Sequence, residues 1–119
     1  MTREALVNGW IELQYAHQRS EVTRDLINVG REIGRMVHED PLECLRIVVE
    51  IINKDDSDLI ISNVAAGPLE NLIVMCGDVV IDEIECISRV NDKFKRTLGM
   101  VWQGGTPDNI WIRVENSSK

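Results

Sequence analysis

Apolar side chains recur at three- and four-residue steps along nearly the whole chain, which is the spacing of one face of an α-helix. Near the start, Leu6, Trp10, Leu13 and His17 follow this pattern, and Thr2 is placed to cap the helix that they predict. Comparable stripes follow at short intervals. They predict helices over residues 3–17, 21–37, 41–53, 58–66, 68–76, 78–90, 92–102 and 109–115.

The ends of these helices are marked by short polar, glycine and proline signals. Asp40-Pro41 combines an N-cap residue with a proline at the first helical position, and Glu43 is placed to complete a capping box. Gly67-Pro68 predicts a break followed by a new helix. Gly77 is placed to end that helix, and Asp78 is placed to cap the next one. The middle of the chain is therefore expected to form separate short helices.

The last segment, residues 109–115, fits two structures. Ile110, Ile112 and Val114 alternate as they would in a strand, whereas Thr106-Pro107-Asp108 before them is typical of a helix start. We expect the helix.

The pattern as a whole predicts an all-α fold. Seven or eight helices joined by short turns should lie as antiparallel neighbours, giving a compact bundle or a short α-solenoid built from helical hairpins. With 119 residues the chain has the length of one domain, which we expect to span residues 1–115. The polar residues 116–119 are expected to form a frayed C-terminal tail.

Composition indicates the sign of the net charge and the cell compartment in which the protein is expected. The formal net charge is −7, and residues 41–90 contain three Lys or Arg against ten Asp or Glu. Such a field repels phosphate backbones and attracts cationic surfaces, so direct nucleic-acid binding is not expected. No apolar run approaches the roughly 20 residues of a membrane span, and the N-terminus lacks the layout of a signal peptide. We therefore expect a cytoplasmic protein that does not enter a membrane.

Side chains suited to catalysis are few. Cys44, Cys76 and Cys86 form no Cys-x-x-Cys pair, and each lies in an apolar stretch where a buried thiol acts as a small hydrophobe. His17 and His38 fall near predicted helix C-termini, where the helix dipole favours a cationic ring. The chain contains none of the common hydrolase, zinc or phosphate-binding motifs. We predict that the protein is not an enzyme and has no catalytic residue, no metal site and no cofactor.

Acidic side chains form the most distinctive cluster. Asp78, Asp82 and Glu85 stand at i, i+4 and i+7 on one face of a helix, and three more acids crowd one turn. The complete candidate set is Asp55, Asp56, Asp58, Asp78, Asp82 and Glu85. The acids fit a solvated, helix-capping face or a surface for a basic partner. A divalent-cation site is disfavoured, because the turn lacks the ligand alternation and the glycine of a calcium loop.

Two motifs resemble a family of short, uncharacterised bacterial proteins. An acidic turn is followed by Ala-Ala-Gly-Pro-Leu-Glu at residues 65–70, and residues 94–102 read Phe-Lys-Arg-Thr-Leu-Gly-Met-Val-Trp. The similarity extends over residues 8–115, and Gly67-Pro68 and Gly99 to Trp102 are its most specific parts. The resemblance implies an all-helical fold and no established activity.

Small size, acidity and few catalytic side chains together predict a non-enzymatic protein that binds a protein partner with a basic surface. The specific form that we expect is an immunity or antitoxin protein that neutralises a basic bacterial toxin, such as a nuclease, by occluding its cationic groove. One alternative is a helical scaffold or adaptor with an apolar groove near Trp102 and Trp111. Another is an enzyme whose site joins a histidine to one of the cysteines.

Overall fold

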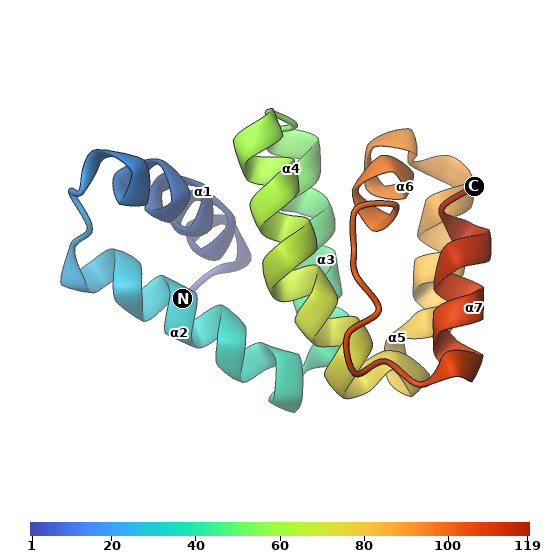
Figure 1. Ribbon diagram of the computed structural model, residues 1–119. Coiled ribbons are helices and arrows are strands. Elements are labelled where there is room, and N and C mark those ends of the chain that lie inside the picture. Colours follow the sequence, from blue (N-terminus) through green and yellow to red (C-terminus); the bar gives the residue numbers. More distant parts are fainter.

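The computed structural model describes all residues from Met1 to Lys119 and contains helices but no strand (Figure 1). The elements are α1 (Arg3–Arg19), α2 (Arg24–Glu39), α3 (Pro41–Lys54), α4 (Asp58–Val64), the π-helical turn η1 (Ala65–Leu69), α5 (Glu70–Val90), α6 (Asp92–Leu98) and α7 (Asp108–Ser117). Because α4, η1 and α5 follow one another without a gap, they form one helix of 33 residues. The predicted all-α fold is confirmed. The predicted number of seven or eight helices is wrong, since the chain forms six.

The long helix from Asp58 to Val90 bends at two places where the sequence predicts a break. The wide turn of η1 contains Pro68, and Gly67 within it departs from helical geometry, with φ −116° and ψ −110°. The second bend is at Cys76, with φ −136° and ψ 31°. Gly77 and Asp78 therefore lie inside α5 and neither end nor cap a helix. Proline and π-turns are common causes of kinks, and a kinked helix continues when its neighbours pack against both halves.

Of the predicted side-chain caps, the one at Thr2 forms, and other helices are capped differently. Thr2 accepts a hydrogen bond from the backbone N–H of Ala5 at 3.0 Å. Asn91 similarly caps α6. The capping box at Asp40 does not form, because Asp40 makes no side-chain cap bond and Glu43 turns to Arg3 instead. The final segment is helical, as expected, and runs to Ser117, beyond the predicted boundary at residue 115.

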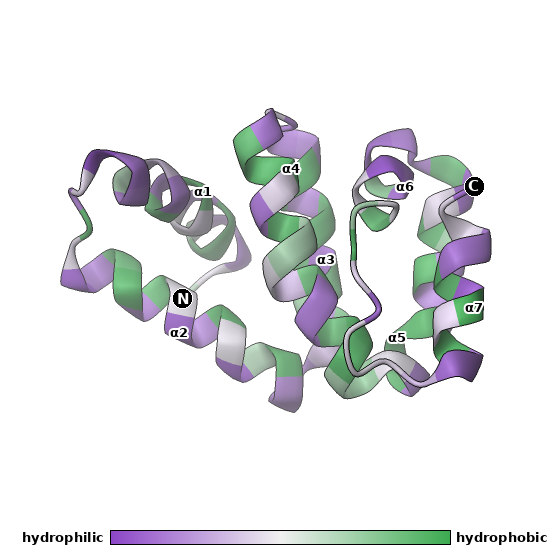
Figure 2. Cartoon of the chain, in the orientation of Figure 1, coloured by the Kyte–Doolittle hydropathy of each residue, from purple (hydrophilic) through white to green (hydrophobic).

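The core surrounds the long helix. That helix contacts each of the other five, with α1 against α4 and with α2, α3, α6 and α7 against α5. In Figure 1, α1 and α2 lie on one side of the α3–α4 pair, and α6 and α7 lie on the other. A single cluster of 27 buried apolar residues connects the two sides. Figure 2 shows the matching alternation of hydrophobic and hydrophilic bands along each helix.

By length and composition alone, the helix Asp58–Val90 is apolar enough to cross a membrane. Half of its most apolar window is buried inside the protein, and the core helix of a soluble protein passes the same test. The apolar character of this helix is thus accounted for by its central place in the core.

Candidate partner-binding surface

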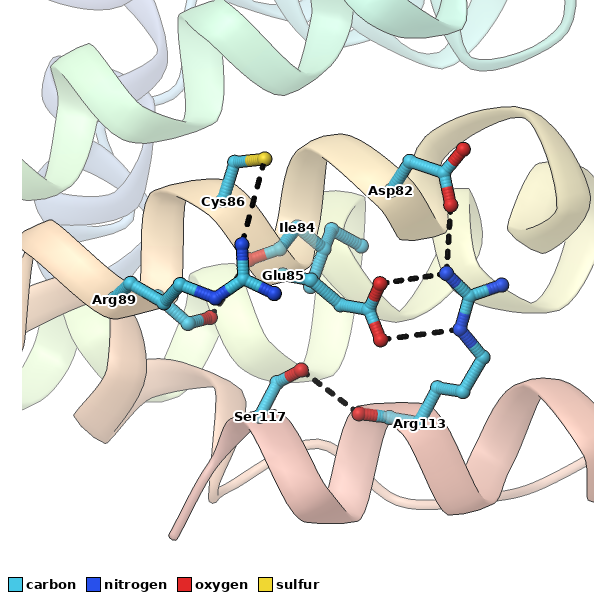
Figure 3. A network of polar contacts seen from close by, with 8 residues as sticks. Asp82, Ile84, Glu85, Cys86, Arg89, Arg113 and Ser117 are labelled. Atoms are coloured by element: carbon cyan, nitrogen blue, oxygen red, sulfur yellow. Dashed lines mark hydrogen bonds and ion pairs between the residues drawn. The ribbon is translucent and has the colours of Figure 1, made fainter.

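Two of the predicted acidic residues, Asp82 and Glu85, face the C-terminal helix. Arg113 of α7 donates to both oxygens of Glu85, at 3.1 Å from Nε and 2.6 Å from Nη2 (Figure 3). Its Nη2 also lies 2.6 Å from Oδ1 of Asp82. These hydrogen bonds from Arg113 hold the pKa of Glu85 below its ordinary value. Both carboxylates therefore help to fasten α7 to α5.

Asp55 and Asp56 are also engaged within the molecule. The carboxylate of Asp55 accepts from the Tyr15 hydroxyl at 2.8 Å and from the backbone N–H of Ser57 at 3.0 Å. Partial burial raises the pKa of Asp55, but its hydrogen bonds to Ser57 and Tyr15 outweigh burial and lower it overall. Asp56 lies 3.5 Å from Nζ of Lys93 in an exposed ion pair. Asp55 thus organises the turn before α4, where the hydroxyl of Ser57 is the N-cap.

Asp58 and Asp78 remain exposed and make no side-chain hydrogen bond or ion pair. They flank the two ends of the loop between α6 and α7. Met100 lines a hollow of about 380 Å³ together with Asp58 and the cationic Arg96, and Pro107 lines another of about 260 Å³ together with Asp78. The structure thus brings these two of the six predicted acids to one loop and leaves the other four elsewhere or paired.

The loop carries the most exposed aromatic side chain of the protein. Trp102 is 81% exposed, and Met100 is 45% exposed. The expected helix over residues 92–102 ends at Leu98, so Trp102 leaves the core face on which its spacing places it. Gly99 directly after Leu98 was the signal that could have indicated this earlier end. We call the two hollows and the exposed side chain between them, with Asp58, Met75, Asp78, Met100 and Trp102, the Trp102 surface. It is elongated, because Asp58 and Asp78 are 20 positions apart on the long helix, about 30 Å at 1.5 Å per residue.

Of the two tryptophans near which an apolar groove is expected, only Trp111 lines a hollow with apolar side chains. Trp111 is half-buried in this hollow of about 150 Å³, lined also by Leu98, Val101 and Val114, and Trp102 takes no part in it.

The cysteines and histidines lie apart from the Trp102 surface. Cys44 is buried, and burial raises its pKa to about 12. Cys76 is half-buried with its thiol 3.2 Å from the carbonyl of Val37, whereas Cys86 is exposed, so the expectation of three buried thiols is wrong for Cys86. His17 and His38 are exposed in the last turns of α1 and α2. No three of the His, Cys, Asp and Glu side chains are grouped so that they could hold a metal ion.

Comparison with protein families shows to which family the chain belongs. Residues 18–119 match a family of unknown function (DUF6869). The chain belongs to this family. The match is consistent with the resemblance to an uncharacterised family, and it excludes most of α1. No curated protein and no solved structure matches the chain.

Proposed function

We propose that this protein is a non-enzymatic binding protein that holds a basic protein partner against the Trp102 surface. The observation that supports this most is the exposed Met100–Trp102 loop with an unpaired carboxylate at each end. We further propose that it acts in the cytoplasm as an immunity or antitoxin protein, with no membrane or nucleic-acid partner of its own.

The apolar part of this surface has the composition of an interface centre. Tryptophan and methionine are enriched in protein interfaces, and tryptophan is prominent among the residues whose removal weakens binding most. In the free protein the large ring of Trp102 is exposed to water, which is unfavourable. Burial in a pocket of a partner would remove this exposure. Met75 and Met100 are flexible side chains that adapt to a facing surface.

The charge of the surface favours a basic partner. Ion pairs inside the molecule do not change its net charge of −7, so the long-range field stays negative. Asp58 and Asp78 are free to add short-range contacts, because neither has a partner within the molecule. A toxin that binds phosphate groups in a cationic groove offers the matching charge, and carboxylates placed there would block its substrate.

Of the six acidic residues predicted to bind a partner, we propose that only Asp58 and Asp78 do so. Asp82 and Glu85 would have to give up Arg113 before binding a partner, and Asp55 would have to give up Tyr15. Breaking such charge-assisted hydrogen bonds offsets much of what a new ion pair gains.

The test begins with a photo-crosslinking amino acid in place of the exposed Met100, which leaves Trp102 intact, introduced in cells of the source organism. The crosslinked protein is then purified, and its association rate is measured at several salt concentrations. We expect a basic protein whose association slows as salt rises, and Trp102→Ala should weaken its affinity by roughly 30-fold or more. The pair Asp58→Asn/Asp78→Asn should slow association roughly 3- to 10-fold.

A matched control removes two exposed, unpaired acids far from the loop, with Glu12→Gln/Asp25→Asn on α1 and α2. If the control slows association as much as the test pair, net charge alone acts and the surface assignment is wrong. If Trp102→Ala weakens binding while salt and Asp58→Asn/Asp78→Asn have no effect, the apolar scaffold is the better function. The exposed apolar side chains of Met75, Met100 and Trp102 are the observation that favours this second candidate, a helical scaffold.

A further inference from the structure

A hollow lined mainly by positively charged and neutral polar side chains lies where the C-terminal parts of α5, α6 and α7 meet. It measures about 260 Å³, and no hydrophobic residue lines it. Arg89 of α5, Lys95 of α6 and Lys119 after α7 contribute three cationic side chains. None of the three takes part in an ion pair within the molecule. This local excess of positive charge stands out in a chain whose net charge is −7.

Glu85 is the one acidic side chain that lines the hollow, and Arg113, which it shares with Asp82, offsets part of its charge. Both oxygens of Glu85 accept from Arg113, as Figure 3 shows, so neither is hydrogen-bonded to the three cations, although Glu85 still attracts Arg89 electrostatically. Arg89 makes only a weak contact of 3.9 Å between its Nη1 and the thiol of Cys86. Its guanidinium therefore keeps donors that a ligand can use.

Two hydroxyl groups in the wall are turned toward the backbone. Ser88 donates to the carbonyl of Ile84, and Ser117 donates to the carbonyl of Arg113, each at 2.8 Å. The side-chain amide of Asn116 makes no hydrogen bond within the molecule and can donate.

Helix dipoles explain part of this cluster but not all of it. Each helix C-terminus carries about half a negative charge, so three helix ends account for about one and a half of the three positive charges. Glu85, which shares Arg113 with Asp82, and the backbone carboxylate of Lys119 offset part of the remainder. A guanidinium and ammonium groups that line one hollow and make no ion pair are suited to an oxyanion with several acceptor oxygens.

We propose that this hollow, the oxyanion hollow, binds a phosphate-class oxyanion. Arg89 and Lys95 are the principal ligands, and Asn116 and Lys119 complete the site at its rim. The site is separate from the Trp102 surface, and its existence does not depend on the proposed function.

The test is an NMR titration of the whole protein with inorganic phosphate and, separately, with pyrophosphate, each at constant ionic strength. We expect saturable shifts of the amide signals of Arg89, Lys95 and Ser117, with a dissociation constant of about 1 mM for phosphate and a lower one for pyrophosphate. Arg89→Gln/Lys95→Gln should weaken pyrophosphate binding by about tenfold or more. The matched control Arg24→Gln/Arg31→Gln removes two exposed, unpaired cations from α2, on the far side of the molecule, and should leave binding unchanged (Figure 1).

Three results would overturn the proposal: shifts that rise linearly without saturation, equal binding by Arg89→Gln/Lys95→Gln, or equal weakening in the control. In the first case the cations serve only the helix ends. If the native protein shows no saturable binding and Arg89→Gln/Lys95→Gln lowers thermal stability, the two cations likewise serve only to stabilise the helix ends. None of these outcomes bears on the protein partner at Trp102, because that surface is measured by a different assay.

Discussion

Single glycines set how closely helices approach one another in this protein. A methyl group added at Gly77 would lie 2.8 Å from Cγ2 of Ile110, and one added at Gly9 would lie 2.8 Å from Cγ2 of Val29. Both distances are well inside van der Waals contact. Gly77 thus lets α7 lie against α5, and Gly9 lets α2 lie against α1.

Gly77→Ala is expected to destabilise the protein by about 1 kcal/mol. Alanine gains up to about 1 kcal/mol in helix propensity, but overpacking against the β-branched Ile110 costs about 1–3 kcal/mol. Chemical denaturation measures the difference. Gly34→Ala is the control, because Gly34 is exposed within α2 with no atom within 4 Å of the added methyl group, and it should stabilise by about 0.5–1 kcal/mol. Equal effects at both positions would contradict the close approach at Gly77.

Tyr15→Phe removes the hydroxyl that binds Asp55 at 2.8 Å. We expect a loss of about 1 kcal/mol in the free energy of unfolding, because the bond is only partly buried. A double-mutant cycle with Asp55→Asn checks this assignment. If the two single losses simply add, Tyr15 and Asp55 do not act together.

Arg113→Gln should change the acid sensitivity of the protein. In the folded protein the pKa of Glu85 lies below its ordinary value of 4.5, so its interaction with Arg113 stabilises the fold above pH 4.5. That contribution is lost as the pH falls through the lowered pKa. The variant should lack this loss, and NMR titration should find the pKa of Glu85 closer to 4.5. An unchanged pKa would mean that the bridge does not persist in solution; Arg24→Gln is the control.

At the scale of elements, helix type was predictable and helix continuity was not. The apolar spacing located every helical stretch, because burial of one face depends on that period alone. Gly67-Pro68 and Gly77 are local signals for a helix end, yet here they mark a bend and a close approach. Whether such residues end a helix depends on packing against α3 and α7, which are distant in sequence.

The end of α1 provides a prediction for an element boundary. Ser20 follows α1 with φ 57° and ψ 38°, a left-handed conformation that disfavours a side chain. Ser20→Gly should therefore raise the free energy of unfolding by about 1 kcal/mol. The converse change, Gly104→Ala, places a side chain at φ 51° and should lower it by about 1 kcal/mol. Thermal melts of both variants test the pair, and a stabilising Gly104→Ala would contradict the loop geometry.

For the whole molecule, part of the uneven charge along the sequence is balanced by ion pairs that form inside the folded protein. The acidic segment 41–90 is met by bases from both ends of the chain, with Arg3 bound to Glu43 and Glu50, and Arg113 bound to Glu85. Sequence spacing correctly placed Asp82 and Glu85 on one face. It could not indicate that an arginine 28 positions after Glu85 would bind both carboxylates. The Trp102 surface was missed for the same reason, since it joins segments that are brought together only by folding.

The family match begins at residue 18, so α1 is largely outside the part that defines the family. Three of its side chains, Leu6, Val7 and Trp10, are nevertheless buried in the main core. Each is worth about 2 kcal/mol on burial, and their sum is comparable to the total stability of about 5–15 kcal/mol of a typical domain.

Removal of residues 1–17 should therefore abolish cooperative folding. Circular dichroism on heating and the dispersion of amide NMR signals measure this directly. A truncated chain that melts cooperatively with native-like spectra would contradict the prediction and would show that residues 18–119 fold alone.

The helix α5 carries Asp78 at one end of the Trp102 surface and Arg89 at the oxyanion hollow, eleven positions further along. At 1.5 Å per residue these positions are about 16 Å apart, roughly two Debye lengths at physiological salt. An anion bound near Arg89 is therefore largely screened from a partner bound near Asp78. The coupling free energy between the two sites should be close to zero, so a protein and a small anion can be bound together with unchanged affinities.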